Sequence, residues 1–125
     1  NLLSGVVSSV GEVTVIDAGQ SGMVSVSGHK SRAGPGDKVY LAIRPEKMRI
    51  SSEAPGEGCN GLRGKLIADS YAGDRSYYYL DVPGLSGRLT VANLNERRDT
   101  ARSIAGSAEN VWAVWPIDSG LLLTS

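Results

Sequence analysis

The chain has 125 residues, 41% of them hydrophobic, which suits one compact domain or two very small subdomains that share a core. Thirteen basic and thirteen acidic residues give zero formal charge, which argues against a nucleic-acid-binding or anionic-membrane-binding surface. The lone cysteine rules out an internal disulfide and indicates a reducing compartment. No apolar run approaches the roughly 18–20 residues that span a bilayer, so direct membrane insertion is not expected.

Polar and apolar residues alternate in short stretches along most of the chain, a period typical of half-buried strands. In the first half we expect strands within residues 2–10, 11–18, 22–28, 38–43 and 47–51. In the second half we expect them within residues 62–73, 74–82, 87–92, 111–115 and 120–125. Residues 93–106 break the alternation, and we expect a long loop with one helical turn there.

The strand pattern predicts an all-β fold of about ten short strands with little helix. Sixteen glycines and five prolines support many turns between these strands. A five-stranded, OB-like barrel fits each half of the chain. The sequence does not decide whether the two halves form two barrels or share strands as one compact domain.

The sequence is an internal duplication. Residues 1–7 (NLLSGVV) and 60–66 (NGLRGKL) align at a constant offset of 59 (60 − 1), which pairs Asn1 with Asn60 and Gly5 with Gly64. The segments that begin at Val39 and Val111 also match once one residue is skipped. We therefore expect a first half at 1–52, a linker at 53–59 and a second half at 60–125, with function residing in their pairing.

No pattern indicates catalysis, a cofactor or a metal site. His29 stands alone in a glycine-rich turn, and Cys59 has no basic cluster near it in sequence. The nearest approach to a phosphate-binding loop, residues 34–39 (GPGDKV), lacks the hydroxyl residue after the lysine. We expect a protein without enzymatic activity of its own.

Residues 41–51 (LAIRPEKMRIS) place a charged pair at the end of an apolar strand. If the chain stays extended, Arg44 and Glu46 share a face, and Pro45 between them ends the ladder pairing. We expect a partly buried Arg–carboxylate clasp that fixes a barrel corner. The functional alternative is a polar contact to a partner domain.

The only aromatic cluster is Tyr77, Tyr78 and Tyr79, preceded by Arg75. In a strand, Tyr77 and Tyr79 face one side and Tyr78 the other, and we expect one of these sides to face the core. A base-stacking role is not expected, because the chain has no net positive charge.

These motifs together resemble the transport-associated OB (TOBE) domain, the C-terminal part of the ATP-binding subunits of bacterial ABC importers. The resemblance covers essentially the whole chain. Its motif residues are Asn1, Leu3, Gly5, Ile43, Arg44, Pro45, Glu46, Asn60, Leu62, Gly64, Tyr71, Gly73, Asp74, Arg75, Tyr78, Leu89, Thr90, Val91, Asn95, Gly106, Val111, Trp115, Pro116, Asp118 and the final leucines. Residues 73–79 (GDRSYYY) most resemble the subfamily that handles spermidine and putrescine.

The resemblance implies a regulatory and dimerisation domain with no catalytic residues of its own. ATP and Mg²⁺ would bind the nucleotide-binding domain of a longer parent protein. The implied partners are a second copy, that nucleotide-binding domain and the membrane permease subunits, at the cytoplasmic face of the bacterial inner membrane.

Two ligand hypotheses remain open at this stage. Relatives with this barrel bind oxyanions such as molybdate, for which the candidates are Ser8, Ser9, Lys65 and Arg88. A polyamine would instead favour carboxylates beside aromatic rings, which points to a ligand or partner contact formed by Asp69, Asp74, Arg75, Tyr71, Tyr77, Tyr79 and Asp81.

Overall fold

The computed structural model describes residues 1–27, 33–85, 87–94 and 110–124. The first half contributes β1 (Leu2–Ser9), β2 (Val13–Asp17), β3 (Met23–Ser27), β4 (Lys38–Ala42) and β5 (Arg49–Ser51). The second half contributes β6 (Cys59–Ala72), β7 (Arg75–Asp81), β8 (Leu89–Leu94), β9 (Asn110–Pro116) and β10 (Leu121–Thr124). Two 3₁₀ turns, η1 (Gly19–Ser21) and η2 (Pro45–Lys47), complete the described elements. The prediction of an all-β fold with about ten strands is confirmed.

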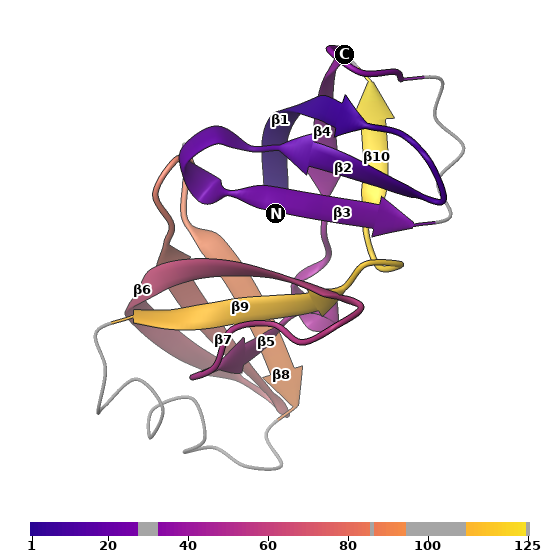
Figure 1. Cartoon of the computed structure of the whole chain (residues 1–125). Coiled ribbons are helices and arrows are strands. Elements are labelled where there is room, and N and C mark those ends of the chain that lie inside the picture. Colours follow the sequence, from indigo (N-terminus) through magenta and orange to yellow (C-terminus); the bar gives the residue numbers. More distant parts are fainter. Residues whose placement is uncertain (28–32, 86, 95–109, 125) are drawn as a thin grey trace.

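The strands form two five-stranded antiparallel sheets. Sheet A has the order β10-β4-β1-β2-β3 and sheet B the order β5-β9-β6-β7-β8. If β1–β5 are matched with β6–β10, the two orders are identical except that each sheet takes its outermost strand from the other half. Figure 1 shows the yellow β10 beside β4 in sheet A and the purple β5 beside β9 in sheet B. The division at residues 53–59 stays a prediction, and strand pairing crosses it in both directions.

The registers confirm that the duplication predicted from the sequence is structural. Leu122 lies opposite Leu41 on β4, and its counterpart Ile50 lies opposite Ala113 on β9. β1 carries a bulge between Val7 and Ser9, and β6 carries one at the same repeat position, between its residues 66 and 68. A bulge bends and twists a strand, so both sheets curl at the same place.

One apolar core is shared by both sheets. Alternate residues of each strand point inward, as the period of two predicts, and the buried cluster draws on both halves. Its largest fully buried side chains include Trp115, Leu62 and Leu80 from sheet B and Ile16 and Leu41 from sheet A. Neither half therefore encloses a core by itself.

The repeated asparagines hold the sheets together. The side-chain amide of Asn60 donates to the carbonyl of Ser25 on β3 at 2.7 Å, and its oxygen accepts from the Ser25 amide at 2.8 Å. Asn1 makes the same two bonds, at 2.7 and 2.8 Å, with Thr90 on β8. Each asparagine thus pairs with a backbone edge in the opposite sheet, as another strand would.

The repeated glycines allow a close backbone approach. A Cβ on Gly5 would lie 2.7 Å from the carbonyl oxygen of Asp17, and one on Gly64 would lie 2.7 Å from that of Asp81. Both distances are shorter than a real Cβ contact. The Asn-x-Leu-x-Gly motif therefore combines a cross-sheet bond, a core leucine and a close approach to the neighbouring strand.

Replacing Asn60 by alanine should destabilise the protein by about 1–3 kcal/mol, because it leaves the Ser25 amide and carbonyl without these bonds. Urea unfolding followed by circular dichroism measures the change. Asn110→Ala is the matched control, since Asn110 is exposed and should shift stability by no more than about 0.5 kcal/mol. Equal effects of the two substitutions would contradict the role assigned to Asn60.

Replacing Gly64 by alanine should cost about 1–3 kcal/mol, because the new methyl group meets strand backbone that cannot yield without moving β7. Gly34→Ala is the control, since nothing lies within 4 Å of the position that a Cβ would take there. Thermal unfolding of both variants tests the prediction. A Gly64→Ala protein as stable as Gly34→Ala would show that the strands are not in close contact there.

Candidate functional site

The contact between the two halves includes a pair of turns that are counterparts in the duplication. η1 follows Asp17, and the turn at Pro83–Gly84 follows Asp81. The Ser21 hydroxyl donates to the Pro83 carbonyl at 2.8 Å. Gly84 has a φ of +93°, and a Cβ there would lie 2.7 Å from the Ser21 hydroxyl oxygen. These turns border an open hollow of about 410 Å³ lined by Gln20, Ser21, Arg63, Pro83, Asn110 and Trp112.

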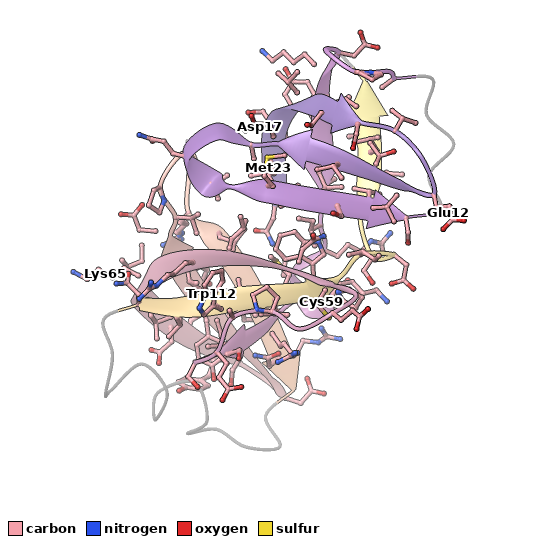
Figure 2. The ribbon with its side chains drawn as sticks, in the orientation of Figure 1. Glu12, Asp17, Met23, Cys59, Lys65 and Trp112 are labelled. Carbon is pink, nitrogen blue, oxygen red and sulfur yellow. The ribbon has the colours of Figure 1, made fainter. Side chains whose placement is uncertain are left out.

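Two further hollows lie on the described surface. One, of about 290 Å³, lies beside η2 and is lined by Glu46, Lys47, Met48, Arg49, Cys59, Asn93, Val114, Trp115 and Pro116. The other, of about 390 Å³, lies on sheet A and is lined by Ser4, Gly5, Val6, Asp17, Ala18, Gly19 and Lys38. Figure 2 labels Cys59 and Trp112 on sheet B and Asp17 and Met23 on sheet A.

These hollows are suited to contact rather than to enclosing a small ligand, because all three are open to solvent. Within residues 1–27, 33–85, 87–94 and 110–124, no group of three or more His, Cys, Asp or Glu side chains is arranged to hold a metal ion. In the same ranges no helix has the length and apolar character needed to cross a membrane.

The prediction that Arg44 and Glu46 form a partly buried clasp is wrong. Both side chains are exposed rather than partly buried. The chain does not stay extended past Arg44: Pro45 opens η2, and the Lys47 amide donates to the Arg44 carbonyl at 3.0 Å. The corner is fixed instead by this turn and by Met48, which is 2% exposed. Arg44 and Glu46 remain available for the alternative, a polar contact to a partner domain.

The tyrosine cluster follows the predicted alternation. Tyr78 is buried in the core, while Tyr77 and Tyr79 lie half-buried on the outer face of β7. The Arg88 guanidinium lies 4.2 Å from the centre of the Tyr79 ring, and the Tyr79 hydroxyl is 3.0 Å from that of Ser70. One ring of the predicted contact is therefore already covered by a cation of the chain itself.

The two aspartates of the predicted ligand contact lie at opposite ends of β7. Asp74 sits in the β6–β7 turn beside Gly73, which has a φ of +63°, and Asp81 is the last residue of the strand. At about 3.3 Å per residue, they are separated by about 23 Å. Asp81 is also placed opposite Lys65 in the β6–β7 ladder, and Arg75 begins β7 next to Asp74. The structure does not gather these carboxylates into one site.

The proposed oxyanion ligands are likewise spread over both sheets. Ser8 and Ser9 end β1 in sheet A, whereas Lys65 belongs to β6 in sheet B. Arg88 immediately precedes β8 and is engaged with Tyr79.

Of the other predicted residues, Trp115 is 1% exposed and lies opposite Asn60, and Pro116 ends β9. Asp69 and Tyr71 lie on β6, and the Tyr71 hydroxyl is 3.4 Å from the Asp69 carboxylate.

His29, Asn95, Gly106 and the loop predicted beyond Leu94 lie outside the described residues. Sequence reasoning did not single out Ser25, and it noted Thr90 only as part of the Leu89-Thr90-Val91 motif, so it missed both as partners of the two asparagines. A signal was present, since SVS at residues 25–27 and TVA at residues 90–92 occupy matching places in the two halves. The role of Ser25 and Thr90 could not be inferred from this match, because the asparagine side chains bond to their backbone atoms and not to their side chains.

Comparison with known proteins relates the chain to transport proteins. The TOBE domain family matches residues 41–123. The chain is 33% identical over 86 residues to the putrescine transport ATP-binding protein PotG of Escherichia coli (strain K12), covering 69% of this chain and 22% of PotG. It is 33% identical over 105 residues to the spermidine/putrescine import ATP-binding protein PotA of Frankia alni, covering 81% of this chain and 22% of that protein.

A third relative is the PotA protein of Rubrobacter xylanophilus, 31% identical over 114 residues, covering 90% of this chain and 29% of that protein. The chain therefore spans 22–29% of the length of these curated relatives, and its similarity is distant and lies in their C-terminal regions.

The fold resembles a crystal structure of the cytoplasmic molybdate-binding protein ModG with molybdate bound, with a TM-score of 0.78 over 100% of this chain and 96% of that chain. Sequence identity to ModG is 14%, so this likeness concerns the fold alone. The family match covers residues 41–123, well over half of the sequence, and includes the motifs at residues 43–46 and 60–64. The chain belongs to the TOBE domain family.

Proposed function

We propose that this chain is a non-catalytic regulatory and dimerisation domain of the ATP-binding subunit of a bacterial ABC importer whose solute is a polyamine. The observation that carries the proposal is its TOBE domain membership combined with similarity to the C-terminal regions of PotG and PotA. In such a subunit, ATP and Mg²⁺ bind a separate nucleotide-binding domain. The complex would sit at the cytoplasmic face of the membrane with the permease subunits.

The composition of the chain supports a role in contact rather than chemistry. Its sequence holds no G-x-x-x-x-G-K-[ST] loop, the pattern whose backbone amides and lysine bind nucleotide phosphates. The described hollows are shallow and lined by unlike side chains. Glu46, exposed on η2, and Arg44, exposed immediately before it, supply polar groups for a neighbouring domain.

The second candidate is a small-ligand domain that binds an oxyanion such as molybdate. The observation in its favour is the fold shared with ModG. Against it stand the zero formal charge, which provides no field to attract an anion, and the placement of Ser8, Ser9, Lys65 and Arg88 on two different sheets.

Isothermal calorimetry with molybdate, sulfate, putrescine and spermidine separates the two candidates. We expect no heat from either oxyanion at concentrations that saturate a micromolar site. Strong heat from molybdate would overturn the ranking in favour of the second candidate.

The amine titrations test whether the domain itself contacts solute. If putrescine or spermidine binds through the predicted contact, either Asp74→Asn or Asp81→Asn should weaken binding. The two aspartates should not act together, because about 23 Å separates them. Asp118→Asn, an exposed aspartate in the turn after β9, is the control. Amine binding unchanged in both variants would remove these aspartates from the proposal.

Sedimentation velocity over a concentration series tests the pairing role. We expect weak, reversible self-association, because a full subunit would add the contacts of its nucleotide-binding domain. A strict monomer at the highest concentration would contradict dimerisation by this domain.

A further inference from the structure

One dipeptide of the chain combines chemical lability with a structural role. Asn60 is the one asparagine in the sequence that precedes a glycine; the others are Asn1, Asn93, Asn95 and Asn110. The side-chain carbonyl of an asparagine can be attacked by the backbone nitrogen of the next residue. Glycine hinders this attack least, because it has no side chain and its backbone is the most flexible. An asparagine followed by glycine is therefore the pair most prone to lose ammonia.

The structure explains why a glycine follows Asn60. An Asn-Gly pair usually favours a hairpin turn, yet here it lies within the strand β6. A Cβ on Gly61 would lie 2.7 Å from the Pro55 ring and 3.0 Å from the Trp112 ring. The chain at Pro55 therefore crosses β6 too closely for a side chain at this position. In the first half the counterpart of Gly61 is Leu2, which is 59% exposed, so the repeat itself does not require glycine.

Asn60 is held by the contact between the two sheets. Its residue is 6% exposed, and its side chain bonds to both backbone groups of Ser25 on β3, at 2.7 and 2.8 Å. Figure 1 shows β6 next to β3 where the sheets meet. Ring closure requires the Asn60 side chain to turn toward the Gly61 nitrogen and the backbone to leave the extended conformation of a strand. Both movements break the bonds to Ser25, so the folded state keeps the reactive groups apart.

We propose that Asn60 is a site of spontaneous deamidation that the pairing of the two sheets keeps closed in the folded protein. The Gly61 nitrogen forms a bond to the side-chain carbonyl carbon of Asn60, and the bond from that carbon to the side-chain nitrogen breaks. The proton of the Gly61 amide leaves with the side-chain nitrogen as ammonia, which gives a cyclic imide. Water then opens the imide to aspartate or isoaspartate. The reaction needs only the chain and water, so it does not depend on the proposed function.

The product does not suit the place of Asn60. Aspartate puts a carboxylate oxygen where the amide nitrogen donated to the Ser25 carbonyl at 2.7 Å, so two acceptor oxygens face each other in a buried position. Isoaspartate also inserts an extra carbon into the backbone of β6 and disturbs the strand register. A chain that deamidates while its sheets are apart is therefore hindered from closing again, which makes a reversible opening irreversible.

Peptide mapping by mass spectrometry measures deamidation at each asparagine of the whole chain. In urea that unfolds the protein, we expect Asn60 to react several times faster than the other asparagines. Without urea its rate should fall at least about 10³-fold, because a protein of ordinary stability is unfolded for less than that fraction of the time. At intermediate urea concentrations the rate should follow the unfolded fraction measured by circular dichroism.

Two variants separate the chemistry from the fold. Gly61→Ala, studied in urea, adds a methyl group beside the attacking nitrogen, so the rate at Asn60 should fall to that of the other asparagines. Asn60→Asp imitates the aspartate product and should lower the urea midpoint relative to the wild type. Asn110→Asp is the matched control, because the same change at an exposed position should leave the midpoint unchanged.

Three results would overturn the inference. Deamidation of Asn60 as fast in native buffer as in urea would show that the fold does not protect it. Equal rates at all asparagines in urea would show that Gly61 does not make Asn60 labile. An Asn60→Asp protein as stable as Asn110→Asp would show that the product is compatible with the contact between the sheets.

Discussion

The structure depends on the reciprocal pairing of its two halves. Each sheet gains its fifth strand from the other half, and each repeated asparagine completes a backbone edge in the opposite sheet. An edge strand whose amides and carbonyls lack partners is a liability for a β protein. Here the exchanged strands cover the edges of β4 and β9, because what one half lacks the other provides. The shared core follows from this arrangement, since inward side chains of both sheets fill the same interior.

Much of this fold could be predicted from the sequence. Alternation identified the strands and set Tyr78 opposite to Tyr77 and Tyr79, and the structure shows that Tyr78 is the one that faces the core. The repeated motif indicated two copies of one unit. Alternation says which face of a strand is buried but not which strand it lies beside, so the exchange of β5 and β10 was not predictable. The Arg44–Glu46 clasp failed because Pro45 starts a tight turn, whereas the prediction assumed that the chain stays extended.

The site was less predictable than the fold, for a physical reason. Interior positions of the two halves remain alike, as with Leu3 and Leu62, or Val39 and Val111, because the shared core constrains their volume. Outer positions differ between the halves, leucine in one and arginine in the other, without any change in backbone pairing. Candidate ligands chosen by residue type, such as Asp74 and Asp81, carried no information about distance, and the structure sets them at opposite ends of one strand.

The crossed strands also bear on how the chain is made. During translation β4 emerges long before β10, its neighbour in sheet A, and β5 emerges before any other strand of sheet B. At about 5–20 residues per second, the first half waits for seconds on the ribosome with an open edge. Because the core takes side chains from both halves, the whole unit matures in a single late event rather than in two successive ones.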